Sequence, residues 1–345
     1  MTASPIQVLV VDDSAFARKV LRQVLSAAPG IQVVDTARDG LDALEKIAAL
    51  RPDVVTLDLV MPHLDGLGVM KALAGAPSPR VVVVSSAGEE SELAMAALQA
   101  GAVELVHKPT ALASERLYEL GAELVSKVRT ASGAVVRPAA QLLPREKSGA
   151  SRVTSPSQHL VVVGTSTGGP AALTRLMTSL PEDFPAPLAL ALHIPEGYTE
   201  ALARRLDNQG ALEVVEAAEG VELRPGRAVL ARAGMHLRVE RDGDQAWVRL
   251  DRVPLKAPHH PSVDVLFESA AASWGPAAVG VVLTGMGDDG LAGARAIRAA
   301  GGSVLTESAE SCVVYGMPRV VVEADLSNAS APMEDMAELL ARYVR

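Results

Sequence analysis

Short apolar runs alternate with amphipathic segments along this chain, and the alternation occurs in two separate series. The first series extends from residue 6 to about residue 128, and the second begins at His159. Runs that are apolar throughout and are separated by helix-like segments predict parallel strands with helices on both sides of the sheet. A chain of 345 residues can also bury two cores of this kind. We therefore predict an α/β protein with two doubly wound, mainly parallel-sheet domains.

The segment between the two series has a different composition. After a closing helix expected near Leu117 to Val128, the pattern gives way to SGAVVRPAAQLLPREKSGASRVTSPSQ, which is rich in Pro, Ser, Ala and Gly. Such a composition is typical of a flexible linker. We predict domains at residues 1–128 and 159–345, joined by a linker at residues 129–158.

The composition disfavours several classes of protein. A net charge of -9 argues against nucleic acid as the main partner, because binding phosphates requires a basic surface. No apolar run is long enough for a bilayer, and the first residues lack the pattern of a signal peptide, so we expect no membrane insertion. Cys312 is the only cysteine, which excludes an intramolecular disulfide and favours a small core residue in a reducing compartment. We expect a cytoplasmic protein.

In the first domain, acidic residues stand where two predicted strands end. Asp12 and Asp13 follow VLVV, and Asp58 follows VVTL. Ligands of open parallel sheets collect at the carboxyl ends of the strands, so these carboxylates are expected to converge. Carboxylate oxygens are the ligands that Mg²⁺ prefers. Taken singly, each acid is more simply explained as the cap of the helix that follows it.

Two more strand ends supply polar side chains to the same edge. Ser85 or Ser86 follows the fourth apolar run, and Lys108, which precedes Pro109, follows the fifth. A hydroxyl and an ammonium group there would hold the oxygens of a phosphoryl group on Asp58. Helix capping does not explain polar side chains at all of these strand ends, so we favour a phosphorylation site.

The stretch VVVGTSTGGP, residues 161–170, leads from a predicted strand into a predicted helix. It lacks the GxGxxG spacing of a dinucleotide loop and the Lys-Ser or Lys-Thr pair of a P-loop. It does match GxSxG, in which a sharp turn exposes a serine hydroxyl at the edge of a sheet. Ser166 is therefore a candidate nucleophile, and an ordinary glycine-rich turn is the alternative.

A serine nucleophile needs a base and a group that orients the base. His193 ends the apolar run LALALH, so it shares a sheet edge with Ser166 and is our candidate base. His259 and His260, which precede a predicted helix, are its rivals. The acid is expected in the glycine-rich loop LTGMGDDG, where Asp288 and Asp289 follow another strand.

With these residues in view, the first domain resembles a response-regulator receiver domain. The resemblance implies a metal site at Asp12, Asp13 and Asp58, with Asp58 in LDLVMP as the phosphoacceptor and Mg²⁺ as the cofactor of phosphorylation. It implies that Ser85 and Lys108 respond to the phosphoryl group.

The resemblance covers about residues 6–128, and it has one departure. Val60 stands two positions after the phosphoacceptor. Receiver domains that are joined to an effector domain like the second domain of this chain usually carry Glu at that position. This bears on the lifetime of the phosphoryl group and not on its formation.

The second domain resembles the chemotaxis protein-glutamate methylesterase family over its whole length. The resemblance rests on five ordered motifs, GTSTGGP, LHIP, HHPSVDVLF, LTGMGDDG and ESCVVYGMP. It implies Ser166 as nucleophile, His193 as base and Asp289 as the orienting acid.

The same resemblance implies Met286, through its amide, in the oxyanion hole and Thr167 and His259 in the active site. Thr165 stands where many members of the family carry alanine.

The resemblance implies hydrolysis of glutamate γ-methyl esters on methyl-accepting chemoreceptors, and deamidation of particular glutamines as a second activity. It implies no cofactor for the esterase reaction and a chemotaxis-type histidine kinase as phosphodonor. We further expect the unphosphorylated first domain to cover the Ser166 edge and phosphorylation of Asp58 to weaken that contact. The rival hypotheses are a phosphorylation-switched adaptor without catalysis and a dinucleotide-binding protein.

Overall fold

A computed structural model describes residues 4–74, 79–86, 88, 90–108, 114–135, 158–253 and 257–344, with the backbone alone for residues 114–120. The chain divides into two units, Met1–Ala140 and Gln141–Arg345. Most of the predicted linker lies outside the described residues. Its first residues are helical, because α5 (Ser114–Ser132) continues beyond the expected end at Val128. The reason is that the buried apolar spacing continues from Leu124 and Val128 to Ala131.

The first unit is built around a five-stranded parallel sheet in the order β2-β1-β3-β4-β5. Its residues are buried on both faces at the centre, as in Val8 to Val11 of β1, which explains why the run is apolar throughout. The strands are β1 (Ile6–Val11), β2 (Ile31–Ala37), β3 (Val54–Leu57), β4 (Arg80–Ser85) and β5 (Glu104–His107).

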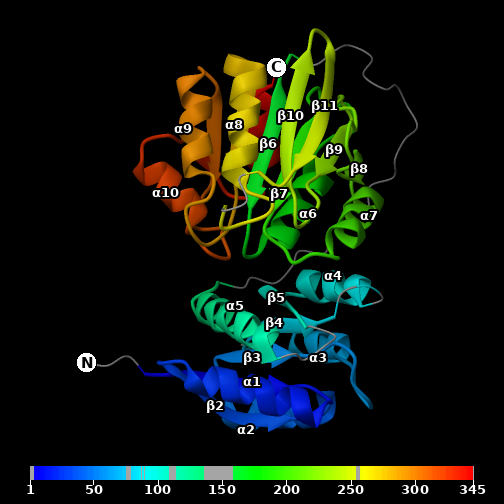
Figure 1. The fold of residues 1–345 in the computed structure, drawn as a ribbon, viewed down its shortest axis with the longest axis vertical. Coiled ribbons are helices and arrows are strands. Elements are labelled where there is room, and N and C mark those ends of the chain that lie inside the picture. Colours follow the sequence, from blue (N-terminus) through cyan, green and yellow to red (C-terminus); the bar gives the residue numbers. More distant parts are fainter. Residues whose placement is uncertain are drawn as a thin grey trace. The chain divides into compact units, whose positions relative to one another are not determined.

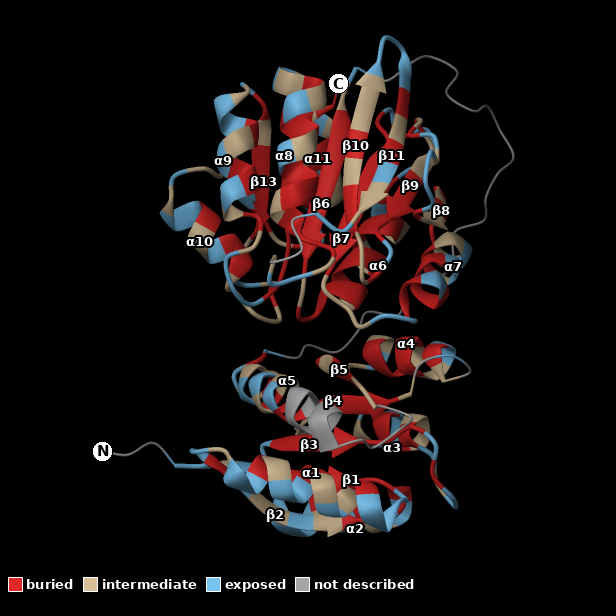
Figure 2. Cartoon of the chain, in the orientation of Figure 1, coloured by how far each residue is buried: buried red, intermediate tan, exposed pale blue. Residues whose placement is uncertain are grey.

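The helices of the first unit cover both faces of this sheet (Figure 1). α1 packs against α5 on one face, and α2, α3 and α4 follow one another on the other, as right-handed crossovers require. Figure 2 shows the buried strands between partly exposed helices. The remaining helices are α1 (Ala15–Ala27), α2 (Gly40–Leu50), α3 (Gly66–Leu73) and α4 (Ser91–Gln99).

The second unit contains a seven-stranded parallel sheet in the order β14-β13-β12-β6-β7-β9-β8. The sequence did not predict β8 or β14, which are short strands at the two edges of the sheet and are only partly buried. Its strands are β6 (Leu160–Thr165), β7 (Leu188–Leu192), β8 (Glu213–Glu216), β9 (Arg227–Leu230), β12 (Ala278–Val282), β13 (Ser303–Glu307) and β14 (Ala329–Ala331).

An antiparallel ribbon, β10 (His236–Asp242) and β11 (Gln245–Asp251), is packed outside this sheet. In Figure 1, α9, α8 and the ribbon lie side by side, and both α9 and β10 contact α8. α6 contacts α7 and α11, and the chain's crossovers put these helices on the opposite face. The helices are α6 (Gly169–Ser179), α7 (Thr199–Gln209), α8 (Val263–Trp274), α9 (Leu291–Ala299), α10 (Met317–Glu323) and α11 (Met336–Tyr343), with a short 3-10 turn at Gly275–Ala277. The prediction of two doubly wound, mainly parallel sheets is thus confirmed.

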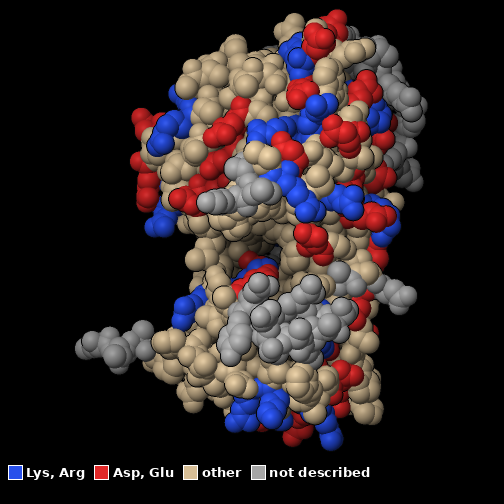
Figure 3. Space-filling model, in the orientation of Figure 1, with Lys and Arg blue, Asp and Glu red and all other residues tan. Residues whose placement is uncertain are grey.

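Charged side chains of both signs are interspersed on the face of the second unit drawn in Figure 3. The ion pairs of the second unit include Arg227 with Glu213 and Arg249 with both Glu219 and Glu240. Cys312 is buried, as expected for a core residue. Among the described residues, no helix is long and apolar enough to cross a bilayer.

Candidate functional site

The main candidate site lies at the carboxyl ends of β6, β7 and β12. The chain proceeds from β6 to β7 on one side and later returns to place β12 on the other, so the strand order reverses here. Such a reversal is the usual ligand site of an open α/β sheet. Thr165 pairs with Leu192 in the parallel register of β6 and β7, so Ser166 and His193, which directly follow these two strands, occupy the next matching positions at the edge of the sheet.

Ser166 is held in a tight turn between β6 and α6. Its amide donates to the carbonyl of Thr284 at 3.0 Å, and the Thr165 hydroxyl donates to the same carbonyl at 2.7 Å. The hydroxyl of Thr284 donates in turn to the Thr167 carbonyl at 2.9 Å. Thr165, the residue that departs from the family pattern, therefore adds a buried hydrogen bond that fixes the turn.

Two glycines allow other segments to approach this turn. A Cβ atom at Gly164 would lie 2.2 Å from a methyl group of Val263, the first residue of α8. A Cβ atom at Gly285 would lie 2.9 Å from the Cβ of Ser166. The backbone that precedes Met286 therefore passes directly beside the serine, because residue 285 has no side chain.

His193 and Asp289 form a buried hydrogen bond. Nε2 of His193 lies 2.8 Å from Oδ2 of Asp289, and each side chain is less than a tenth exposed. Nδ1 of His193 is also buried and has no hydrogen-bond partner among the described residues. When the aspartate is ionised it accepts the proton of Nε2, which leaves Nδ1 as the nitrogen able to take up a proton.

The start of α8 anchors the carboxylate of Asp289. Its Oδ1 accepts from the Ser262 hydroxyl and the Asp264 amide, both at 2.9 Å, and its Oδ2 accepts from the Val263 amide at 2.7 Å. Burial acts to raise the pKa of Asp289, but His193 and these backbone donors outweigh burial and hold the pKa far below the usual range. Asp289 therefore stays ionised throughout the neutral range.

The two rival histidines take other positions. His259 stacks on His193 with ring centroids 3.9 Å apart and an angle of 19° between the rings. Loss of hydration and the adjacent His193 lower the pKa of His259 to about 4, although the residue as a whole remains exposed. His260 instead approaches His236, a buried residue whose Nδ1 accepts from the Ser262 amide at 3.2 Å.

The remaining predicted residues lie around this centre. Thr167 is buried directly after Ser166, and Met286 is half exposed in the loop that follows β12. Asp288, the alternative acid, is exposed, and no side-chain hydrogen bond is described for it. The structure thus brings Asp289, and not Asp288, to His193.

Sequence reasoning missed two residues that shape the site. Ser262 caps α8 and binds Asp289, and Asp264 accepts from the amides of Gly290 and Gly293 at 2.9 and 2.7 Å. The Ser-x-Asp spacing at the start of α8 is a helix-capping signal, but it does not reveal which loop the acid meets.

The partly buried position of Asp264 gives a pH-dependent stability. Burial raises the pKa of Asp264 to about 6, and the charge of Asp289 acts in the same direction. An acid whose pKa rises on folding stabilises the fold below its unfolded pKa, and this contribution is lost as the pH rises through about 6.

We expect an Asp264→Asn variant to gain stability relative to the wild type as the pH rises. The free energy of unfolding should shift in its favour by about 1 to 3 kcal/mol between pH 4 and pH 8. Urea unfolding followed by tryptophan fluorescence measures this, because both tryptophans, Trp247 and Trp274, lie in the second unit. A difference that is the same at both pH values would contradict the expectation.

The acidic site of the first unit lies at the carboxyl ends of β1, β3 and β5. Carboxylate oxygens of Asp12, Asp13 and Asp58 lie within 4.8 Å of one another. Nζ of Lys108 donates to Asp12 at 2.7 Å and to Asp58 at 2.8 Å. Burial raises the pKa of Asp58 and the nearby Asp12 adds to this, whereas the Lys108 bond opposes it.

Two other groups named in the sequence analysis also lie at this edge of the sheet. Ser85 ends β4 and donates to Glu90 at 2.8 Å, while Pro109 lies outside the described residues. Val60 is half exposed, and its amide lies 3.4 Å from Asp58. Hard oxygen ligands from three carboxylates are a donor set that fits Mg²⁺.

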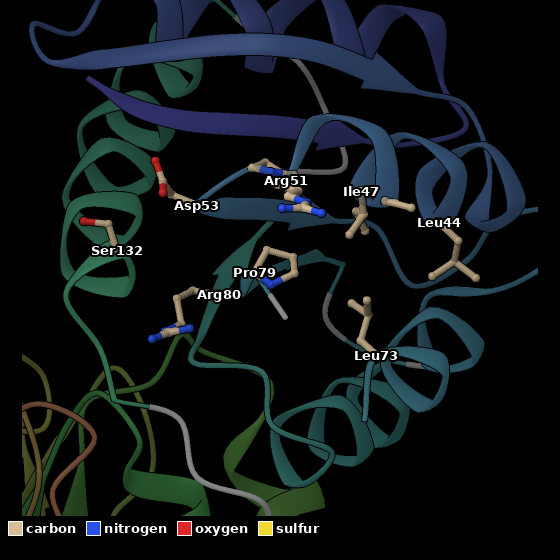
Figure 4. Close-up of a pocket in the computed structure, with 10 residues that line it drawn as sticks. Leu44, Ile47, Arg51, Asp53, Leu73, Pro79, Arg80 and Ser132 are labelled. Carbon is tan, nitrogen blue, oxygen red and sulfur yellow. The ribbon is translucent and has the colours of Figure 1, made fainter. Parts of the chain in front are cut away.

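A pocket of about 760 Å³ opens at the opposite end of this sheet, where β3 and β4 begin (Figure 4). It combines Arg51, Asp53 and Arg80 with apolar side chains of α2 and α3. Its described lining residues include no histidine or cysteine. Because it opens at the end of the sheet where β3 and β4 begin, the pocket is separate from the carboxylate site at the carboxyl ends of the strands.

Each of the two units matches a known protein family. The family described as CheB methylesterase matches residues 161–340, and the family described as response regulator receiver domain matches residues 8–119. The crystal structure of the Thermotoga maritima CheB methylesterase catalytic domain is similar to the second unit. Its TM-score is 0.53 at 37% identity, and the match covers 55% of this chain and all of that chain.

Full-length relatives share the same layout. The chain is 72% identical over 344 residues to protein-glutamate methylesterase/protein-glutamine glutaminase 5 of Myxococcus xanthus (strain DK1622), with 99% of each chain covered. It is 45% identical over 355 residues to a protein-glutamate methylesterase/protein-glutamine glutaminase of Symbiobacterium thermophilum, with 99% of this chain and 97% of that protein covered. The chain therefore belongs to the CheB methylesterase family and carries a response regulator receiver domain.

Proposed function

We propose that this protein hydrolyses glutamate γ-methyl esters on chemoreceptors, with deamidation of particular glutamines as a second activity. The buried hydrogen bond between His193 and Asp289, beside the turn that carries Ser166, is the main support. The names of the relatives supply the substrate class. The reducing environment suggested by a single cysteine agrees with a cytoplasmic enzyme.

In the proposed reaction, the hydroxyl oxygen of Ser166 attacks the ester carbonyl. Nδ1 of His193 takes the serine proton while Nε2–H remains bonded to Asp289. The Met286 amide would stabilise the oxyanion, a contribution of typically about 3 to 4 kcal/mol per donor. The start of α6, three residues beyond the serine, adds the positive end of a helix dipole.

His193 then returns the proton to the leaving methoxide, and methanol departs. The same nitrogen removes a proton from water, which attacks the acyl-enzyme and releases glutamate and Ser166. With a glutamine substrate the leaving group is ammonia. His259, whose pKa is about 4, stays neutral beside His193 and so does not oppose the positive charge that forms there.

The receiver domain would regulate this reaction by phosphorylation of Asp58. Asp12, Asp13 and Asp58 would hold Mg²⁺, which neutralises charge on the phosphoryl oxygens when bound. Lys108 and Ser85 would bind those oxygens and so respond to the new charge. The phosphodonor would be a histidine kinase of the chemotaxis type.

A small-molecule phosphodonor is expected to raise methanol release from methylated receptor membranes by at least about 5-fold, the low end of typical coupling between sites. The stimulation should vanish in an Asp58→Asn variant with an unchanged basal rate, because the acceptor carboxylate is lost. If no methanol is released under any condition, the result would contradict the esterase proposal and favour the rival hypothesis of a phosphorylation-switched adaptor without catalysis. Phosphorylation that survives in Asp58→Asn would overturn the assignment of the acceptor.

A shortened chain that begins at Ser151 tests the direction of the regulation. If the unphosphorylated receiver inhibits the second domain, which we propose to start at residue 159, this chain should work faster than the intact unphosphorylated protein. Equal rates would remove the inhibitory part of the proposal, while phosphorylation could still activate by another route.

A further inference from the structure

The loop that carries Asp289 and the first turn of α8 exchange hydrogen bonds. In one direction, the amide of Asp264 donates to Oδ1 of Asp289 at 2.9 Å. In the other, Oδ1 of Asp264 accepts from the amides of Gly290 and Gly293. Each acid therefore satisfies backbone donors on the segment that bears the other.

This exchange replaces an ordinary cap at the start of α9. The N-cap residue of α9 is Gly290, which has no side chain to accept a hydrogen bond from the first turn. Asp264 supplies that acceptor from a different helix. Because Gly290 directly follows Asp289, a bond to its amide fixes the backbone next to the orienting carboxylate.

Electrostatics alone would not favour a carboxylate at this position. Asp264 faces the ionised Asp289 across the bond and has Glu268 one turn further along its own helix, and both charges act to raise its pKa. A partly buried acid beside like charges costs stability, so the geometry of its hydrogen bonds is the feature to explain. Both amide bonds go to Oδ1, and Oδ2 has no described hydrogen-bond partner.

We propose that Asp264 is a positioning residue that clamps the Asp289 loop, so that Asp289 keeps its hydrogen bond to His193 during the reaction. The proposal rests on the esterase function proposed above and adds a residue to it. No hydrogen bond between Asp264 and His193 is described; Asp264 acts through Asp289 and Gly290. A small displacement of Asp289 would misalign the imidazole.

Three substitutions in the full-length chain separate geometry from charge. Asp264→Asn keeps an acceptor oxygen with two lone pairs in the place of Oδ1 and removes the charge. Asp264→Glu keeps the charge and moves the carboxylate. Asp264→Ala removes both. Glu338→Ala is the matched control, since Glu338 is an exposed first-turn acid of α11 whose one described ion pair is with Arg342.

We expect Asp264→Ala and Asp264→Glu to lower kcat by about 10- to 100-fold with little change in KM, the scale of a misplaced catalytic group. Asp264→Asn should stay within about 3-fold of the wild type, because its amide oxygen still accepts both backbone hydrogen bonds. Glu338→Ala should stay within the same range, because it removes an exposed acid of α11. If Asp264→Ala does not fold, Asp264→Glu carries the test. Wild-type kcat in the folded Ala or Glu variant, or an equal loss in Asn and Ala, would overturn the proposal.

A second readout does not depend on ester hydrolysis. The proton on Nε2 of His193, shared with Asp289, should give a low-field proton resonance, assigned by its absence in His193→Gln. The wild type and Asp264→Asn should retain it, and Asp264→Ala should lose it. Failure of the wild type to release methanol would refute the proposed function, whereas retention of this resonance in Asp264→Ala would refute the clamp.

Discussion

Replacing Ser166 with alanine is expected to abolish esterase activity without destabilising the protein. The loss should be on the order of 10⁶-fold in kcat, the scale found when a serine hydrolase loses its nucleophile. No hydrogen bond from the Ser166 hydroxyl is described, whereas its amide, which alanine also has, donates to Thr284. Stability and the fold of the turn should therefore be unchanged, since only the reacting atom is removed.

Labelling with a serine-directed phosphonate checks the same prediction without a receptor substrate. The wild type should be labelled once, and Ser166→Ala should not be labelled. Ser179→Ala, an exposed serine at the end of α6, serves as the control and should react as the wild type does. Labelling of Ser166→Ala at the wild-type rate would exclude Ser166 as nucleophile, and unlabelled wild type would favour a binding protein.

The sequence predicted the fold well where strands are buried on both faces, because burial leaves an uninterrupted apolar run. β1 and β6 are of this kind. The prediction missed β8 and β14, whose burial is partial because each has a neighbour on one side only. It also ended α5 too early, because alanine at position 131 reads as linker composition although it is fully buried.

For the candidate site, the rule that strand ends share an edge brought Ser166, His193 and the two adjacent acids together. The choice between the acids came only from the resemblance, and the hydrogen bond to His193 now favours Asp289. The choice of imidazole nitrogen and the role of Asp264 were beyond the sequence. Both depend on how α8 packs against the loop after β12, and the contacting residues lie 25 or more positions apart.

Replacing Asp289 with asparagine is expected to lower kcat by about 10⁴-fold, as when a triad loses the carboxylate that selects the imidazole tautomer. An asparagine can donate to Nε2, which would move the ring proton to Nδ1 and remove the base. The substitution also conflicts with its surroundings. Both oxygens of Asp289 accept from backbone amides, of Val263 and of Asp264. In either orientation the new NH₂ group would therefore face an N–H donor.

The neighbouring residue provides a matched control for this prediction. Asp288→Asn removes the same charge one position earlier, from an exposed side chain without a described hydrogen bond, and should keep kcat within about 3-fold because surface changes of this kind have small effects. Asp289→Asn should also lower the free energy of unfolding, by about 1 to 3 kcal/mol for a donor left facing another donor. If Asp288→Asn were instead the inactive variant, the orienting acid would have to be reassigned, and the anchoring of Asp289 on α8 would be structural only.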